Sequence, residues 1–202
     1  MGYDYFPSNP GHWVIYDVDS LYYDDFHDTV FNYHYQIKEV IESIFLDIQN
    51  RPTQRINRFK CVDSVNWYLA DVWYSNITSS TAEKAEENVR FVKLIFPIAS
   101  GKSWNGNAFN NLNGFDYPDY EYDNLYNPYS VNGTAFDSTV TVIQNIDYNP
   151  IRQYDQFEVY AKNIGLIYKK YKMINIYFNP EQPDTTYYGF DYTYKIVSYG
   201  NN

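Results

Sequence analysis

The sequence predicts a mainly β protein, built as a strongly curved antiparallel sheet of about eight to ten strands with one long aromatic and acidic loop. Aromatic residues make up 21% of the chain, and 25 residues are tyrosine, a side chain that suits the half-buried surface of a sheet. Apolar and polar residues alternate over many short segments that turn-forming residues separate. So many consecutive strands rarely form a flat sheet, so we expect a barrel or half-barrel, with a two-sheet sandwich as the alternative.

We expect a single β domain over residues 1–202, because this length suits one domain and neither a tandem repeat nor a linker is visible. A turn-rich segment that ends at Gly11 opens the chain. Alternating segments then predict strands over residues 12–22, 53–62, 65–78 and 89–98. Ser80 and Glu83 have the spacing of a capping box, so residues 79–88 could form one or two helical turns.

Residues 29–47 carry two competing patterns. A spacing of three and four favours a helix over residues 37–48 and is shown by Ile37, Val40, Ile41, Ile44, Phe45 and Ile48. A spacing of two favours a strand and is shown by Phe31, Tyr33, Tyr35 and Ile37. A single bulge near Glu39 would reproduce the helical spacing within a strand, so we expect one long strand, with the helix as the alternative.

Residues 157–171 predict the central strand of the sheet, with a bend at residues 163–165, where Gly165 is free of a Cβ penalty. Apolar side chains fall on both sides of this segment, which is typical of a strand that is covered on both faces. Further strands are expected over residues 134–146, 173–178 and 187–199.

Residues 99–133 show no period and form the predicted long loop, which is rich in Asn, Gly, Asp and Tyr. Its rings and amides could form a binding platform for a sugar, and the candidate residues are Trp104, Asn105, Asn107, Phe109, Tyr117, Tyr120 and Tyr122. The alternative, which we favour, is that these aromatic side chains fold back and cap one end of the sheet.

The same loop carries an acidic cluster whose oxygen atoms could bind calcium, formed by Asp116, Asp119, Glu121 and Asp123. The spacing of these residues matches no EF-hand, and we expect no other cofactor. A carboxylate-dependent glycan hydrolase that uses these acids near Trp104 is the enzymatic alternative.

Other common chemistries find no support in the sequence. The three histidines lack metal-ligand spacing, and there is neither a Gly-x-Ser-x-Gly nucleophile turn nor a glycine-rich phosphate loop. We therefore expect no enzymatic activity. The single cysteine, Cys61, is expected to be a small buried apolar residue.

The formal net charge of -10 argues against nucleic acid and anionic membrane surfaces as partners, because both require clustered basic residues. No segment approaches the roughly 18 apolar residues of a membrane-spanning helix.

Several stretches resemble uncharacterised exported lipoproteins of Bacteroidetes-type bacteria. The similarity lies in Tyr5-Phe6-Pro7 with Gly11-His12-Trp13-Val14-Ile15-Tyr16, in Val92-Lys93-Leu94-Ile95-Phe96-Pro97, in Trp104-Asn105-Gly106-Asn107, and in Val159-Tyr160-Ala161-Lys162-Asn163-Ile164-Gly165-Leu166-Ile167-Tyr168. The resemblance spans nearly the whole chain and carries no active site. It implies export, a lipid anchor as the only attachment to a membrane, and a place in the cell envelope or on the outer-membrane surface.

The function that follows is that of a non-enzymatic exported envelope protein that acts by ligand binding or scaffolding. A curled sheet with one long aromatic loop could hold an apolar or glycan ligand inside it or at its mouth.

Overall fold

The computed structural model describes residues 1–112, 117–178 and 185–202. These residues form one antiparallel sheet of twelve strands in the order β6-β5-β4-β3-β2-β1-β12-β11-β10-β9-β8-β7. The elements are η1 (Tyr3–Tyr5), β1 (His12–Asp24), β2 (Thr29–Leu46), β3 (Pro52–Cys61), β4 (Trp67–Ile77), β5 (Thr81–Glu86), β6 (Val89–Ile95), β7 (Ser103–Trp104), β8 (Tyr120–Val131), β9 (Thr134–Asn149), β10 (Arg152–Ala161), β11 (Gly165–Phe178) and β12 (Thr185–Asn201). Among these described residues, no helix has the length and apolarity needed to cross a membrane.

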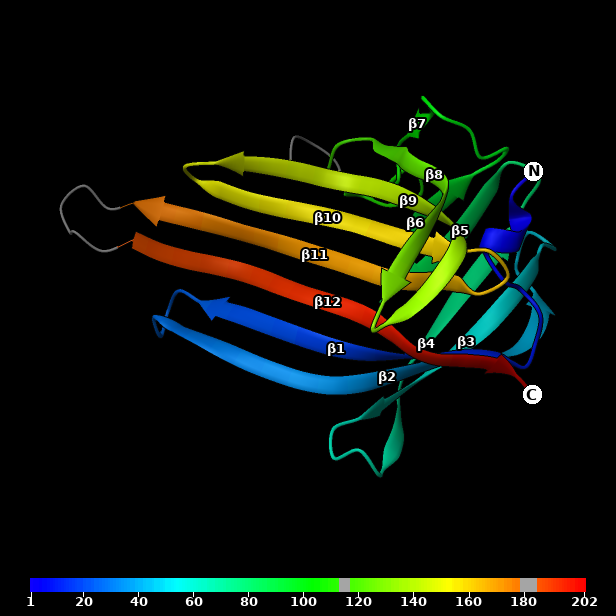
Figure 1. The fold of residues 1–202 in the computed structure, drawn as a ribbon, viewed down its shortest axis with the longest axis horizontal. Helices are drawn as coiled ribbons and strands as arrows, with labels where there is room; N and C mark the ends of the chain where they lie inside the picture. The colour runs from blue at the N-terminus through cyan, green and yellow to red at the C-terminus, as the bar shows by residue number, and fades with distance from the viewer. Residues whose placement is uncertain (113–116, 179–184) are drawn as a thin grey trace.

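The sheet curls until its two edge strands come close, which gives a nearly closed barrel (Figure 1). Hydrogen bonds join the two edges, and two of them involve Val92. The backbone N–H of Val92 on β6 donates to the carbonyl of Gly106 at 2.8 Å, and Nε1 of Trp104 on β7 donates to the carbonyl of Val92 at 2.8 Å. The predicted curved antiparallel sheet is therefore confirmed, with twelve strands in place of eight to ten.

Part of the sheet extends beyond the barrel, on the left of Figure 1. Pairing between β2 and β3 starts at Gln36, so residues 29–35 of β2 continue past β3. We call these residues and the neighbouring ends of β1, β12, β11, β10 and β9 the projecting sheet. One of its faces continues into the barrel interior, because side chains two residues apart on a strand share a face.

The N-terminal segment closes the opposite end of the barrel, where η1 and the N-terminus lie in Figure 1. Tyr5 and Phe6 are buried in the largest core cluster, and the Phe6 ring lies 6.4 Å from that of Tyr160. The backbone N–H of Asn163 donates to the carbonyl of Asp4 at 2.6 Å. The chain's own first residues thus cover this end of the barrel.

Residues 157–171 are not one bent strand, which corrects the prediction. They form the hairpin β10–β11, in which Ala161 pairs with Gly165. Asn163 and Gly165 have φ angles of 63° and 91°, and these left-handed conformations reverse the chain at the predicted bend. Both strands lie inside the sheet, and β11 also includes residues 173–178, which were expected to form a separate strand.

Both helix alternatives were wrong. Residues 29–46 form the strand β2, whose register shifts between Ile41 and Ser43 and not near Glu39. Residues 81–86 form β5, because the Thr78 hydroxyl accepts the N–H groups of Ser80 and Thr81 in a turn that leads into a strand.

The predicted loop of residues 99–133 contains two strands, β7 and β8. The register of β8 against β9 shifts on either side of Asn127, and both Asn124 and Tyr126 have positive φ angles, of 45° and 62°. These irregularities change the face on which each side chain lies, which explains why the sequence shows no period there.

Candidate ligand-binding site in the barrel interior

A layer of charged side chains crosses the interior of the barrel. We call it the ion layer, and it consists of Glu39 (β2), Arg58 (β3), Lys84 and Glu86 (β5), Lys93 (β6), Glu158 (β10) and Lys169 (β11). These residues come from six strands that only the curling of the sheet brings together. Buried charges at this density must be paired, because an isolated charge is costly to remove from water.

One half of the ion layer centres on Glu39. Its carboxylate accepts a hydrogen bond from Nε of Arg58 at 3.1 Å and another from Nζ of Lys84 at 2.8 Å. Arg58 also donates to Asp71 at 3.0 Å, and its guanidinium lies 3.5 Å from the centre of the Trp73 ring. This half therefore combines ion pairs with a cation–π contact.

The other half centres on Glu158, which is 1% exposed. Its carboxylate accepts a hydrogen bond from Nζ of Lys93 at 2.9 Å and another from the hydroxyl of Tyr160 at 2.6 Å. Nζ of Lys93 also lies 3.0 Å from Glu86, and Nζ of Lys169 lies 3.6 Å from Glu86 and 3.4 Å from Glu158. Two lysines and two glutamates thus form a compact square of alternating charge.

The surroundings keep these groups ionised. Burial raises the pKa of Glu158, but the positive charges of Lys93 and Lys169 lower it more, and the resulting pKa is about 2. The pKa of Glu86 is lowered in the same way, since the attraction of Lys169 and Lys93 outweighs the effect of burial. Burial lowers the pKa of Lys93, and the nearby Glu158 and Glu86 raise it above its ordinary value.

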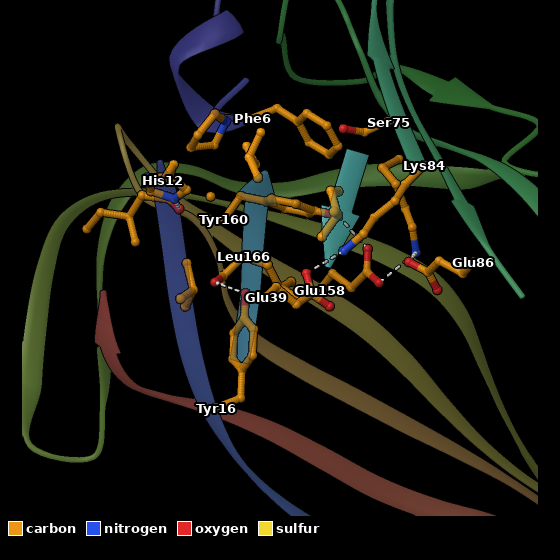
Figure 2. A pocket seen from close by; sticks show the side chains of 17 residues that line it. Phe6, His12, Tyr16, Glu39, Ser75, Lys84, Glu86, Glu158, Tyr160 and Leu166 are labelled. Atoms are coloured by element: carbon orange, nitrogen blue, oxygen red, sulfur yellow. Dashed lines mark hydrogen bonds and ion pairs between the residues drawn. The ribbon is translucent and has the colours of Figure 1, made fainter. Parts of the chain in front are cut away.

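The ion layer separates two cavities. A small one, of about 70 Å³, lies between the ion layer and the N-terminal segment. Figure 2 shows Phe6 on one side of this cavity and Glu39, Lys84, Glu86 and Glu158 together on the other. The large cavity, of about 450 Å³, shares Glu39, Lys84, Glu86 and Lys93 with the small one and continues on the other side of the layer.

Aromatic rings and amides line the large cavity. The rings are those of Trp73, Phe91, Tyr117, Tyr120, Tyr171, Tyr192 and Tyr194, and the amides are those of Asn107, Gln144 and Gln156. The rings of Tyr171 and Tyr192 stack at 4.8 Å. Two residues further along β11 and β12, toward the projecting sheet, the next cross-strand pair on the same face is Met173 and Phe190. Phe190 is 45% exposed. The large cavity therefore faces the projecting sheet, and its volume is in the range of small-molecule sites.

Asn107 has the one buried side-chain donor on this wall that lacks a partner within the described residues. The side chain is 4% exposed, and its Oδ1 accepts Nδ2 of Asn110 at 3.1 Å. The Nδ2 group makes no hydrogen bond to any described residue. A buried donor without an acceptor costs about 1 to 3 kcal/mol, so an acceptor from outside the chain that reached this group would remove that cost.

The residues of the predicted sugar platform lie in different places. Asn107, Tyr117 and Tyr120 line the large cavity. Trp104 is buried and donates to Val92, and Tyr122 is buried with its hydroxyl donating to the carbonyl of Ile95 at 2.6 Å. These two rings join the barrel edges, whereas the alternative in the sequence analysis placed the loop aromatics over one end of the sheet.

Two other residues of that platform lie outside the cavity wall. Oδ1 of Asn105 accepts the backbone N–H of Asn107 at 2.8 Å and so shapes the turn. Phe109 is 56% exposed.

The predicted calcium cluster shows no ligand geometry in the part of the chain that the structure describes. Asp119, Glu121 and Asp123 are exposed, and Asp116 lies outside the described residues. Among the described residues, no three of His, Cys, Asp and Glu are arranged to hold a metal ion. Calcium at this cluster stays a prediction.

Sequence reasoning missed the ion layer. A signal was present, because Lys93 stands alone between Val92 and Leu94, and Glu158 stands alone between Phe157 and Val159. A single charge within an apolar strand segment indicates either an exposed face or a buried partner, and local sequence cannot distinguish the two.

Comparison with solved structures supports the architecture. The structure is similar to that of a Bacteroides fragilis protein described as a candidate exported protein with a YmcC-like fold, with a TM-score of 0.50 over 97% of this chain and 98% of that chain. The two chains share a fold. Their sequence identity is 9%, so the likeness extends to the fold alone. No protein-family model matches the chain, and no curated protein matches it.

Proposed function

We propose that this protein is a non-enzymatic, exported protein of the cell envelope that binds a ligand in the large cavity. The observation that carries the proposal is Asn107, which lines the large cavity and whose buried Nδ2 group has no acceptor among the described residues. A cavity of about 450 Å³ that faces the projecting sheet gives a ligand the necessary room.

Export is supported by the structural relative, which is described as a candidate exported protein, and by the resemblance of the sequence to exported lipoproteins. The resemblance further suggests a lipid anchor on a cysteine ahead of the matching N-terminal residues. Surface digestion of intact cells that express the full gene tests this part. A protein that resists the protease until the cells are broken would contradict a place on the outer surface.

The charges of the interior favour binding over catalysis. A glycoside hydrolase needs one carboxylic acid with a raised pKa beside an ionised partner. Glu86 and Glu158 share the same two lysines, and the pKa of each is lowered. The loop acids Glu121 and Asp123 alternate with the buried Tyr120 and Tyr122, so they point away from the interior.

A cavity-filling variant tests the location of the site. Gln156 lines the large cavity, and a Gln156→Trp substitution would place an indole within it. Thermal denaturation would be followed with N-phenyl-1-naphthylamine, a set of neutral oligosaccharides, oligogalacturonate and spermine as probes. We expect at least one probe to raise the Tm of the wild type and to leave that of the variant unchanged, because a ligand that binds only the folded state stabilises it.

Circular dichroism of Gln156→Trp provides the control that the sheet still forms. The proposal fails if none of the probes shifts the Tm, or if the filled variant responds as the wild type does.

A further inference from the structure

The charge balance of the large cavity indicates what kind of ligand it can hold. Arg58, Lys84, Lys93 and Lys169 are the cations of its wall, and each lies within 3.6 Å of at least one carboxylate. A charged ligand would have to break ion pairs that already compensate one another, or would remain uncompensated inside the protein. A ligand without net charge meets neither obstacle.

The amides of the wall argue against a purely apolar ligand. Asn107 presents an unpartnered donor, and Gln144 and Gln156 are also buried on the wall. An apolar molecule would displace water from these groups and offer no hydrogen bond in return, which is unfavourable for buried polar atoms. The ligand should therefore carry several oxygen atoms.

The rings of the wall suggest the shape of that ligand. Tyr171, Tyr192 and Tyr194 present apolar ring surfaces with polar hydroxyl tips, next to the amides. A pyranose ring has the matching chemistry, because its hydroxyl groups radiate from the rim while its C–H groups form two apolar faces. Sites of this kind combine ring surfaces with a few polar groups that set orientation.

We propose that the large cavity binds one end of a neutral oligosaccharide, and that an oxygen atom of the sugar accepts a hydrogen bond from the Nδ2 group of Asn107. This inference rests on the proposed function and specifies its ligand. The sugar units outside the cavity would extend beyond the stacked Tyr171 and Tyr192 rings and lie over Phe190. Phe190 is on the same face of β12 as Tyr192 and is 45% exposed. Phe190 stacks with Tyr22 at 4.9 Å, so the aromatic surface continues onto the projecting sheet.

Isothermal titration calorimetry with neutral oligosaccharides of the common linkages, each at two and at six units, tests this inference. We expect Asn107→Leu to weaken the binding of both lengths about tenfold, which corresponds to one hydrogen bond. Asn57→Leu is the matched control. The Oδ1 atom of Asn57 is also buried without a partner among the described residues, but Asn57 alternates with the cavity residues Ile56 and Arg58 and so faces away from the interior. Its affinity should equal that of the wild type.

A second variant keeps the test independent of the loop around Asn107. Phe190→Ala removes an exposed ring, so it should fold normally and should weaken the binding of six units more than that of two. Binding of N-phenyl-1-naphthylamine or oligogalacturonate without binding of any neutral oligosaccharide would overturn this ligand class while leaving the proposed function in place. Absence of binding by every probe would overturn both. Equal affinities of Asn107→Leu and Asn57→Leu would overturn the role assigned to Asn107.

Discussion

Substitution of Glu158 by glutamine should lower the free energy of unfolding by about 3 to 5 kcal/mol, which is the usual cost of removing one member of a buried ion pair. Glu158 is 1% exposed, and its carboxylate lies 2.9 Å from Nζ of Lys93 and 3.4 Å from Nζ of Lys169. Glutamine can still accept the hydrogen bond of Tyr160, but it carries no charge. Lys93 and Lys169 would then share Glu86.

The pKa of Glu158 gives a second route to this magnitude. Burial raises the pKa of this carboxyl, but the positive charges of Lys93 and Lys169 lower it by more. The net change is from the ordinary value of 4.5 to about 2. Since one pKa unit corresponds to about 1.4 kcal/mol, the stabilisation at neutral pH is about 3 kcal/mol. The pKa is lower in the folded chain than in the unfolded chain, so this stabilisation is complete above about pH 4.5 and is lost as the pH falls toward 2.

Urea denaturation at pH 7 and at pH 3, followed by tryptophan fluorescence, measures the effect, provided that the slope m stays the same in both proteins. The difference between wild type and Glu158→Gln should be largest at pH 7 and smaller at pH 3. Glu121→Gln is the control, because Glu121 is exposed on β8 and its substitution should change the free energy of unfolding by less than about 0.5 kcal/mol. A loss below about 1 kcal/mol at pH 7 for Glu158→Gln would refute the reasoning, because removing one member of a buried ion pair leaves the charge of the other member uncompensated.

Three further predictions concern the closure of the barrel. Gly165→Ala should lower the free energy of unfolding by about 1 to 3 kcal/mol, because the residue has a φ of +91° and a Cβ would lie 2.9 Å from Cδ of Pro7. An unchanged Tm would contradict this prediction. Trp104→Ala should lower the free energy of unfolding, measured by urea denaturation, by about 3 to 5 kcal/mol, since it leaves a cavity in place of a buried indole and removes the hydrogen bond to Val92. A stability equal to that of the wild type would show that Trp104 does not close the edge. The Cys61 thiol, which is 2% exposed as the sequence predicts, should react with a thiol reagent only as fast as the barrel opens; equal rates with and without denaturant would disprove its burial.

Much of the fold follows from local patterns. The alternation of Phe31, Tyr33, Tyr35 and Ile37 correctly predicts a strand, and the helical spacing that follows it arises from a bulge between Ile41 and Ser43. The turn at Asn163 and Gly165 was also visible. Whether that turn bends one strand or reverses the chain depends on pairing between Ala161 and Gly165 and along the strands beyond them, which local sequence does not contain.

The candidate site was less accessible to sequence reasoning. Asn107, Tyr117 and Tyr120 were named from the composition of the loop, and they do lie on the cavity wall. The ion layer was not predicted, because a charge within an apolar strand has the same local pattern whether it faces water or a partner. Trp104 and Tyr122 were candidates for ligand contact, but their hydrogen bonds with Val92 and Ile95 hold the two barrel edges together.

The sequence by itself determined that this protein is built mainly of antiparallel strands, because strand formation depends on alternation and turn chemistry between near neighbours. Only the tertiary structure decided what the sheet encloses. Lys93 and Glu158 are 65 residues apart in the chain and 2.9 Å apart in the barrel. Contacts of that kind arise only when twelve strands curl and their edges meet, and they divide the interior into a small cavity under the N-terminal segment and a large cavity with room for a ligand.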